Sequence, residues 1–128
     1  MTSPVTVVWD ANRAEHEADL HEVDLVGLLT QLDGNARTLV TVLSGEGHAA
    51  CGGDARTGVV MYVTFDGDRF HQLVSESADD DSDRWVVAGG QAGTYPARCV
   101  VSVDAASAAL SWYADRDELL PTARWESS

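Results

Sequence analysis

The sequence predicts an α+β fold, in which a mostly antiparallel sheet of about five to seven strands is covered by two helices. Short runs of β-branched and aromatic residues recur along the chain, and the Asp and Gly residues between several of them indicate hairpins. Only two segments carry apolar residues at helical spacing. A chain of 128 residues is long enough for one core, so residues 1–128 are expected to form a single domain.

The first part of the chain is expected to hold one strand and one helix. Val5–Trp9 is rich in β-branched residues, which is typical of a strand, and a polar, acidic connection follows it. A helix is predicted over residues 22–33, ended by Gly34 and Asn35. It rests on four leucines at positions i, i+3, i+4 and i+7: Leu25, Leu28, Leu29 and Leu32.

The middle of the chain is expected to contain three strands and a tight turn. The strands cover residues 38–43, 59–65 and 70–74, and the second of them has apolar side chains at every other position. Between the last two strands, Asp66-Gly67 predicts a two-residue hairpin turn, because both residues accept positive φ angles.

The last third is expected to resume the sheet and to add the second helix. Trp85–Ala88 and Arg98–Ser102 are predicted strands, with a glycine-rich turn over residues 89–93. Ser102 or Asp104 is expected to cap a helix that runs to about residue 115. Its inner side is formed by Ala106, Ala109, Leu110 and Tyr113. The apolar Trp125 predicts that the tail, residues 122–126, forms a short strand or docks on the domain.

The net charge of −13 constrains the partners of the protein. It results from 21 acidic residues and eight basic ones, all of them arginine. Nucleic acid is excluded as a direct ligand, because like charge repels the phosphates. A basic protein, a cation or solubility alone remain as explanations of the acidity. The sequence shows no basic leader and no apolar run of roughly 18 residues, so we expect no membrane segment and a cytoplasmic location.

The residues that usually carry catalysis or hold metals do not form a complete set. Cys51 and Cys99 are too far apart for a metal knuckle, and we expect reduced, buried thiols. His16 and His21 are separated by one residue too many for the HExxH zinc helix, and they are interpreted as solvated residues before the first helix. We therefore expect no metal, no cofactor and no enzymatic activity.

An aspartate run is the most unusual feature of the sequence. Four carboxylates fall within five positions and are followed by Trp85: Asp79, Asp80, Asp81 and Asp83. Their alternate spacing resembles the start of an EF-hand loop, but Arg84 stands where glycine is required and Gly90 where the bidentate glutamate is required. Either the run is a solvated hairpin tip, or it is reserved for a basic partner.

Residues 85–126 combine an aromatic strand, a Tyr-Pro turn, an alanine-rich helix and a closing Arg-Trp-Glu. This pattern resembles the type-one immunity proteins of bacterial polymorphic toxin systems, which are abundant in actinobacteria and bind a secreted toxin encoded beside them. The residues that carry the resemblance are Val103, Ala109, Tyr113, Pro121 and Trp125, all at packing or turn positions.

The resemblance implies a protein that neutralises a cognate toxin, commonly a nuclease or nucleic-acid deaminase, by occluding its basic substrate groove. The expected interface then comprises the aspartate run with Trp85, together with Asp66 and Asp68 of the predicted turn. Trp85 has two interpretations, an interface anchor and a core residue, of which the core is the more usual place for tryptophan. The alternative function is an acidic cation-binding or adaptor module, and the oligomeric state stays open.

Overall fold

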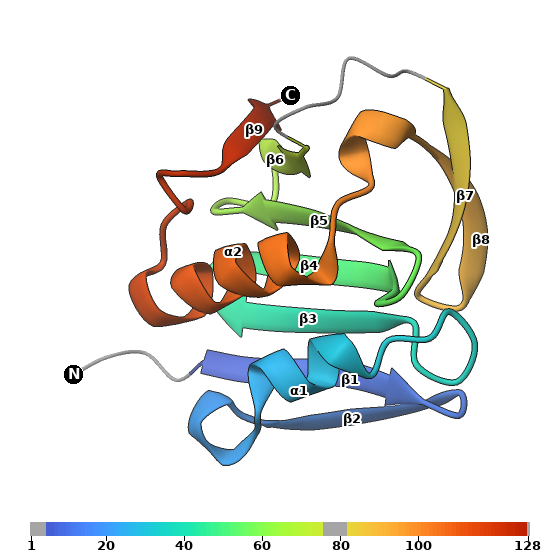
Figure 1. Ribbon diagram of the computed structural model, residues 1–128. Helices are drawn as coiled ribbons and strands as arrows, with labels where there is room; N and C mark the ends of the chain where they lie inside the picture. Colours follow the sequence, from blue (N-terminus) through green and yellow to red (C-terminus); the bar gives the residue numbers. More distant parts are fainter. Residues whose placement is uncertain (1–4, 76–81, 128) are drawn as a thin grey trace.

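The structure, a computed structural model, describes residues 5–75 and 82–127 (Figure 1). A seven-stranded antiparallel sheet has the strand order β2-β1-β3-β4-β5-β6-β9, and a separate two-stranded sheet consists of β7 and β8. Both α-helices cover one face of the large sheet, and the small sheet lies at one end of its strands (Figure 1). The predicted α+β fold with a mostly antiparallel sheet is confirmed.

The acidic connection after the first strand is itself a strand. β1 (Val5–Ala11) and β2 (Ala14–Asp19) form a hairpin whose turn residues, Asn12 and Arg13, have φ angles of 53° and 68°. The sequence analysis took this segment for a polar, acidic connection and did not predict the strand, because β2 is the edge of the sheet. An edge strand rich in charge lacks the apolar alternation by which a strand is recognised.

The centre of the sheet contains one strand that its composition does not predict. β3 (Leu39–Ser44), β5 (Gly58–Thr64) and β6 (Phe70–Val74) confirm the three predicted strands. Between the first two lies β4 (Gly47–Asp54), whose sequence consists mostly of Gly, Ala and Asp, residues that are depleted in strands. These small side chains are required by close packing: a Cβ on Gly52 would approach the Cβ of Ala88 to 2.5 Å.

Both predicted helices are present, but only the second begins at a cap that the sequence analysis named. α1 (Leu25–Thr30) is shorter than the predicted 22–33, because residues 20–22 form the 3₁₀ turn η1 (Leu20–Glu22) and Asp24 starts the helix by accepting a hydrogen bond from Gly27 N at 3.0 Å. α2 (Val103–Arg116) is capped by Ser102, whose Oγ accepts from Ala105 N at 3.1 Å. The inner residues of α2 are buried as predicted. None of the described helices has the length and apolarity needed to cross a membrane.

The region from residue 83 to 101 differs most from prediction. β7 (Asp83–Ala88) does not rejoin the large sheet but pairs with β8 (Gln91–Pro96), and only Gly89 and Gly90 form the turn, with φ angles of 64° and 79°. The predicted strand at Arg98–Ser102 was wrong. That segment is a 3₁₀ turn, η2 (Ala97–Cys99), followed by a single bridge between Val101 and Val59.

The tail docks on the sheet as a strand, as the sequence predicts. β9 (Arg124–Ser127) pairs with β6, and Leu73 lies opposite Trp125. The indole of Trp125 is half-buried, and its Nε1 donates to the carbonyl of Leu120 at 3.2 Å. Arg98 joins η2 to the same strand through two bonds to Glu126, of 2.6 Å from Nε and 3.1 Å from Nη2.

Two apolar cores result from this arrangement. The main core lies between the helices and the sheet, and its largest fully buried side chains include Tyr113, Leu29, Met61 and Leu110. The smaller core lies where the β7–β8 hairpin packs on the other face of the sheet and consists of Val60, Val86 and Val100, with Tyr95 against them. Because Val59 and Val60 alternate in β5, each serves a different core.

A chain of hydrogen bonds that starts at one carboxylate connects the turn of the β7–β8 hairpin to the large sheet. Asp10 of β1 accepts hydrogen bonds from the backbone nitrogens of Thr38 and Leu39, at 2.7 and 2.9 Å, and from the Thr38 hydroxyl. The same hydroxyl, in a fully buried side chain, accepts from Gly90 N at 2.8 Å in the hairpin turn. We call this chain of bonds through Asp10, Thr38 and Gly90 the Asp10 clamp.

We expect Asp10→Ala to lower the free energy of unfolding by about 2–4 kcal/mol, because it leaves partly buried donors without an acceptor. Urea denaturation of the variant and the wild type measures this. Asp68→Ala is the matched control, since it removes the same charge from an exposed loop and should change stability by less than about 0.5 kcal/mol. Equal effects of the two substitutions would show that only the charge matters.

The Arg98–Glu126 pair predicts a pH-dependent contribution to stability. Hydrogen bonding to Arg98 holds the pKa of the Glu126 carboxyl below its ordinary value of 4.5. A lowered folded-state pKa stabilises the fold fully above the unfolded-state pKa, and this stabilisation disappears as the pH falls through the folded value. The difference in melting temperature between wild type and Glu126→Gln should therefore shrink between about pH 7 and about pH 3. A difference independent of pH would contradict the charge-assisted bond.

Candidate functional site

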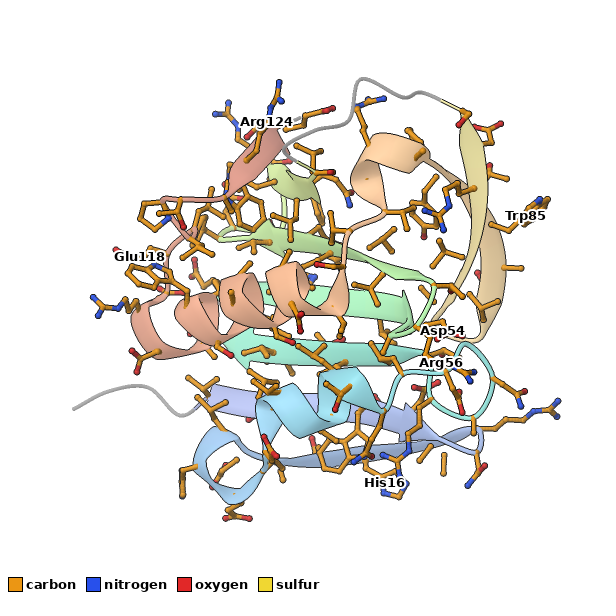
Figure 2. The ribbon with its side chains drawn as sticks, viewed as in Figure 1. His16, Asp54, Arg56, Trp85, Glu118 and Arg124 are labelled. Carbon is orange, nitrogen blue, oxygen red and sulfur yellow. The ribbon has the colours of Figure 1, made fainter. Side chains whose placement is uncertain are left out.

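The β7–β8 hairpin presents an aromatic side chain directly to solvent. Val86 is 6% exposed and faces the smaller core, so the alternation of the strand turns Trp85 outward. Trp85 is 76% exposed and projects away from the domain (Figure 2). The interpretation of Trp85 as a core residue was wrong, because the strand belongs to a hairpin with one solvated face and not to the central sheet.

The predicted interface residues fall into separate groups. Asp83 is exposed on the same outward side of β7 as Trp85, two positions before it. Asp79, Asp80 and Asp81 lie outside the described residues. Asp66 and Asp68 lie in loop 65–69, beyond the far end of β5 from the hairpin (Figure 1). The structure therefore brings Asp83 and Trp85 together and separates them from Asp66 and Asp68.

Loop 65–69 is longer than the predicted two-residue turn, because Thr64 pairs with Phe70. The Asp66 carboxylate accepts bonds from the backbone nitrogens of Asp68 and Arg69, at 2.9 and 3.0 Å, and these bonds lower the pKa of Asp66. Asp66 thus shapes the loop. Asp68 is exposed and leaves its carboxylate toward solvent.

A groove of about 680 Å³ lies beside the hairpin turn. One wall is formed by Val87, Gly89 and Gly90, and the opposite wall by β1, β3 and the β1–β2 turn. Its polar lining includes Asp10, Arg13 and Glu15. Because Val87 and Trp85 share one side of β7, the groove adjoins the surface that carries Trp85.

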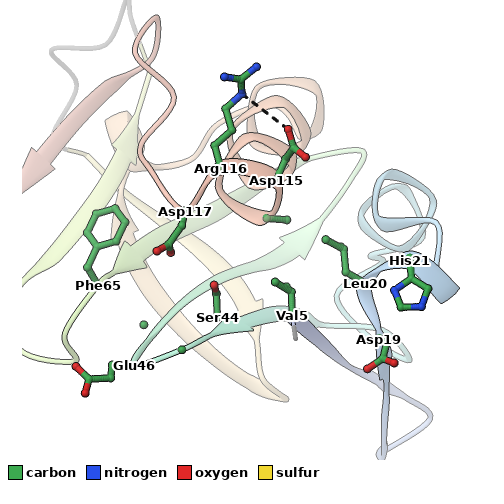
Figure 3. A pocket seen from close by; sticks show the side chains of 13 residues that line it. Val5, Asp19, Leu20, His21, Ser44, Glu46, Phe65, Asp115, Arg116 and Asp117 are labelled. Carbon is green, nitrogen blue, oxygen red and sulfur yellow. Dashed lines mark ion pairs between the residues drawn. The ribbon is translucent and has the colours of Figure 1, made fainter. Parts of the chain in front are cut away.

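A second cleft, of about 870 Å³, is strongly acidic (Figure 3). Its carboxylates come from β2, the β3–β4 turn and the end of α2: Asp19, Glu46, Asp115 and Asp117. Arg116 lies 3.8 Å from Asp115 and stacks over Trp112, with 4.3 Å between the guanidinium carbon and the ring centroid. Local sequence patterns did not reveal this cleft. The available signal was two aspartates at a helix C-terminus, where the helix dipole disfavours them.

A buried phenol lies behind Phe65, one of the residues that line the acidic cleft. Tyr113 is fully buried, and no described group within bonding distance pairs with its hydroxyl. Burial, reinforced by the charge of Asp117, raises the pKa of Tyr113 to about 12. The side chain therefore stays neutral, and its ring packs against Phe65 with centroids 5.9 Å apart.

The face of the large sheet that points away from the helices carries an aromatic cluster, defined as His48, Tyr62 and Phe70. His48 Nε2 lies 3.0 Å from the Tyr62 hydroxyl, and the three ring centroids are 5.3–6.4 Å apart. All three side chains are half-buried. Burial raises the pKa of Tyr62, so its phenol stays protonated. We call this side of the sheet the open face; its other described members include Val8, Thr41 and Leu43.

His16 and His21, interpreted from the sequence as solvated residues before the first helix, are both exposed. His16 lies in β2 and stacks on Trp9, with 5.7 Å between ring centroids and 19° between planes. His21 belongs to η1 and brings a ligand atom within 4.8 Å of atoms from Asp19 and Glu22. All three of these side chains are exposed, and such acidic groups are common on protein surfaces. Cys51 and Cys99 are free and buried as expected, and burial raises the pKa of the Cys51 thiol to about 12.

Comparison with known proteins yields one family. The family model described as immunity protein Imm1 matches residues 12–127, which include every element from β2 to β9. No curated protein and no solved structure matches the chain. The resemblance inferred from residues 85–126 therefore extends to nearly the whole domain.

The different environments of two tryptophans predict opposite effects of truncation. We expect Trp85→Ala to change the free energy of unfolding by less than about 0.5 kcal/mol, since the side chain has little packing to lose. Trp125→Ala should lower it by about 2–3 kcal/mol, because the indole packs on the main core and holds the tail. Chemical denaturation measures both, and a large loss of stability in Trp85→Ala would show that Trp85 packs on the fold.

Proposed function

The chain belongs to the Imm1 family of immunity proteins, and from this membership we propose that it neutralises a cognate nuclease or nucleic-acid deaminase toxin by covering the toxin's basic substrate groove. It does so in the cytoplasm of the producing cell, where such a toxin meets nucleic acid. The action is binding and not catalysis. The toxin is the one encoded beside the gene, as is usual in polymorphic toxin systems.

The exposure of Trp85 on a clamped hairpin is the observation that supports this proposal most. Large aromatic side chains are enriched among the residues that dominate binding energy. Trp85 is the most exposed of the large apolar side chains among the described residues. The hairpin does not hold Trp85 loosely. The Asp10 clamp, the close contact at Gly52 and the bond from Arg84 Nη2 to the Thr57 carbonyl at 2.9 Å fix it to the sheet.

Charge complementarity supports a basic partner. Asp83 lies beside Trp85, and the rest of the aspartate run, Asp79, Asp80 and Asp81, precedes it in the sequence. A toxin that acts on nucleic acid needs a positive groove for phosphates, and a domain with a charge of −13 is attracted to it at long range. Asp66, Asp68 and the acidic cleft extend the negative surface at the other end of the sheet, where they add to steering.

We expect replacement of the four aspartates, Asp79, Asp80, Asp81 and Asp83, by asparagine to slow association with the toxin domain by about one to two decades at low salt. Rim charges act on the encounter, so the deficit should shrink as salt approaches about 1 M. Trp85→Ala should instead raise the dissociation rate by about tenfold or more. Surface plasmon resonance on an immobilised, catalytically inactivated toxin domain measures both rates.

The controls separate the possible failures. Asp104→Asn removes an exposed carboxylate from α2 and should leave both rates within about twofold. If the wild type binds the toxin domain and both variants keep its association and dissociation rates, the side of β7 that carries Asp83 and Trp85 is excluded as the interface. Absence of any complex, together with a calcium-dependent rise in melting temperature, would favour the cation-binding alternative.

A further inference from the structure

We propose that the open face is a second contact surface for the same basic toxin domain, with the aromatic cluster at its centre and the acidic strand β2 at its edge. This inference rests on the proposed function and assigns to the interface a region that the sequence did not indicate. The occupant is a protein surface that is positive at one side and apolar in the middle.

The open face is a solvated sheet surface with unusually apolar residues. In β5, the odd-numbered Val59, Met61 and Val63 are buried under the helices, so Tyr62 projects to the opposite side. Strand pairing places the other two rings on that side, because Thr64 lies opposite both His48 and Phe70. Next to them, Leu43 is 42% exposed. An antiparallel sheet with one solvated face ordinarily carries polar residues there.

The aromatic cluster is rigid before any partner arrives. The three rings contact one another, and the bond between His48 and Tyr62 restricts both side chains. Tyrosine and phenylalanine offer a large contact area for few rotatable bonds, so little side-chain entropy is lost on binding. These are the properties of the centre of a protein interface.

One edge of the open face supplies the charge. His16 of β2 stacks on Trp9, which packs against the main core, so its neighbours Glu15 and Glu17 project to the open face. Both glutamates are exposed, and neither forms an ion pair with another described residue. At the opposite edge, Arg98 and Arg124 both act on Glu126, so that edge does not share the negative charge of β2. The open face is thus negative along β2 and apolar between its two edges.

This charge distribution decides which partner fits. A second copy of the chain would bring another −13 charge against the same acidic edge, which disfavours self-association. A basic toxin domain is attracted by it. The groove beside the hairpin is lined by Val8, Thr41 and Val87, so it connects the open face to the side of β7 that carries Trp85. One toxin domain can therefore contact both surfaces.

Hydroxyl-radical footprinting of the wild-type protein, free and in complex with the inactivated toxin domain, tests the proposal without any substitution. The oxidation rates of tyrosine, phenylalanine, histidine and tryptophan side chains all report on their exposure. We expect Tyr62, Phe70 and Trp85 to lose about threefold or more of their oxidation rate in the complex, as fully covered interface residues do. Phe65, 37% exposed and located at the acidic cleft, should keep its rate.

Binding kinetics of substituted proteins provide the second test. Phe70→Ala and His48→Ala should each raise the dissociation rate by about tenfold, provided that their melting curves show a folded protein. Glu15→Gln with Glu17→Gln should slow association by about three- to tenfold at low salt and not at about 1 M salt. The matched control is Asp104→Asn with Glu118→Gln, which removes two charges from the helix side and should change neither rate.

Protection of Trp85 without Tyr62 and Phe70 would overturn the open-face proposal and leave the hairpin interface intact. Protection of Phe65 instead would assign the contact to the acidic cleft and overturn it as well. Protection of the open face in the free protein that grows with concentration would identify a second copy as the occupant. If no complex forms, the proposed function fails together with this inference.

Discussion

The Asp10 clamp is the interaction on which the surface architecture depends. A two-stranded hairpin is marginally stable by itself. Here one carboxylate orients Thr38, and the Thr38 hydroxyl holds the turn of the β7–β8 hairpin at Gly90. The absence of a side chain at Gly52 lets Ala88 approach β4. Together they allow Val86 and Val60 to form a small core, and that core turns Trp85 outward.

The sequence predicted those elements whose pattern is local. Examples are the leucine spacing of α1, the cap and inner face of α2, and the alternation of β5. Each of these patterns depends only on residues that lie within four positions of one another. β2 and β4 were missed because position in the sheet decides their composition. β2 is charged because it is an edge, and β4 is small because α2 and the hairpin crowd it.

The candidate site shows the same division. Asp83 and Trp85 are neighbours in sequence, so a local reading could pair them. Their exposure depended on β7 forming a separate sheet, which no local pattern revealed. The aromatic cluster joins β4, β5 and β6, and its residues meet only through the register of three strands. The acidic cleft likewise draws on β2, the β3–β4 turn and α2. Register and element packing are tertiary properties, so neither surface could be predicted.

A highly charged inhibitor must obtain affinity and specificity from different groups. At physiological salt the Debye length is about 8 Å, so carboxylates at the rim accelerate encounter and reject like-charged partners but contribute little once water screens them. A long-lived complex needs apolar contact that excludes water. In the proposed interface, that contact comes from Trp85 of β7 and from the aromatic cluster on β4, β5 and β6.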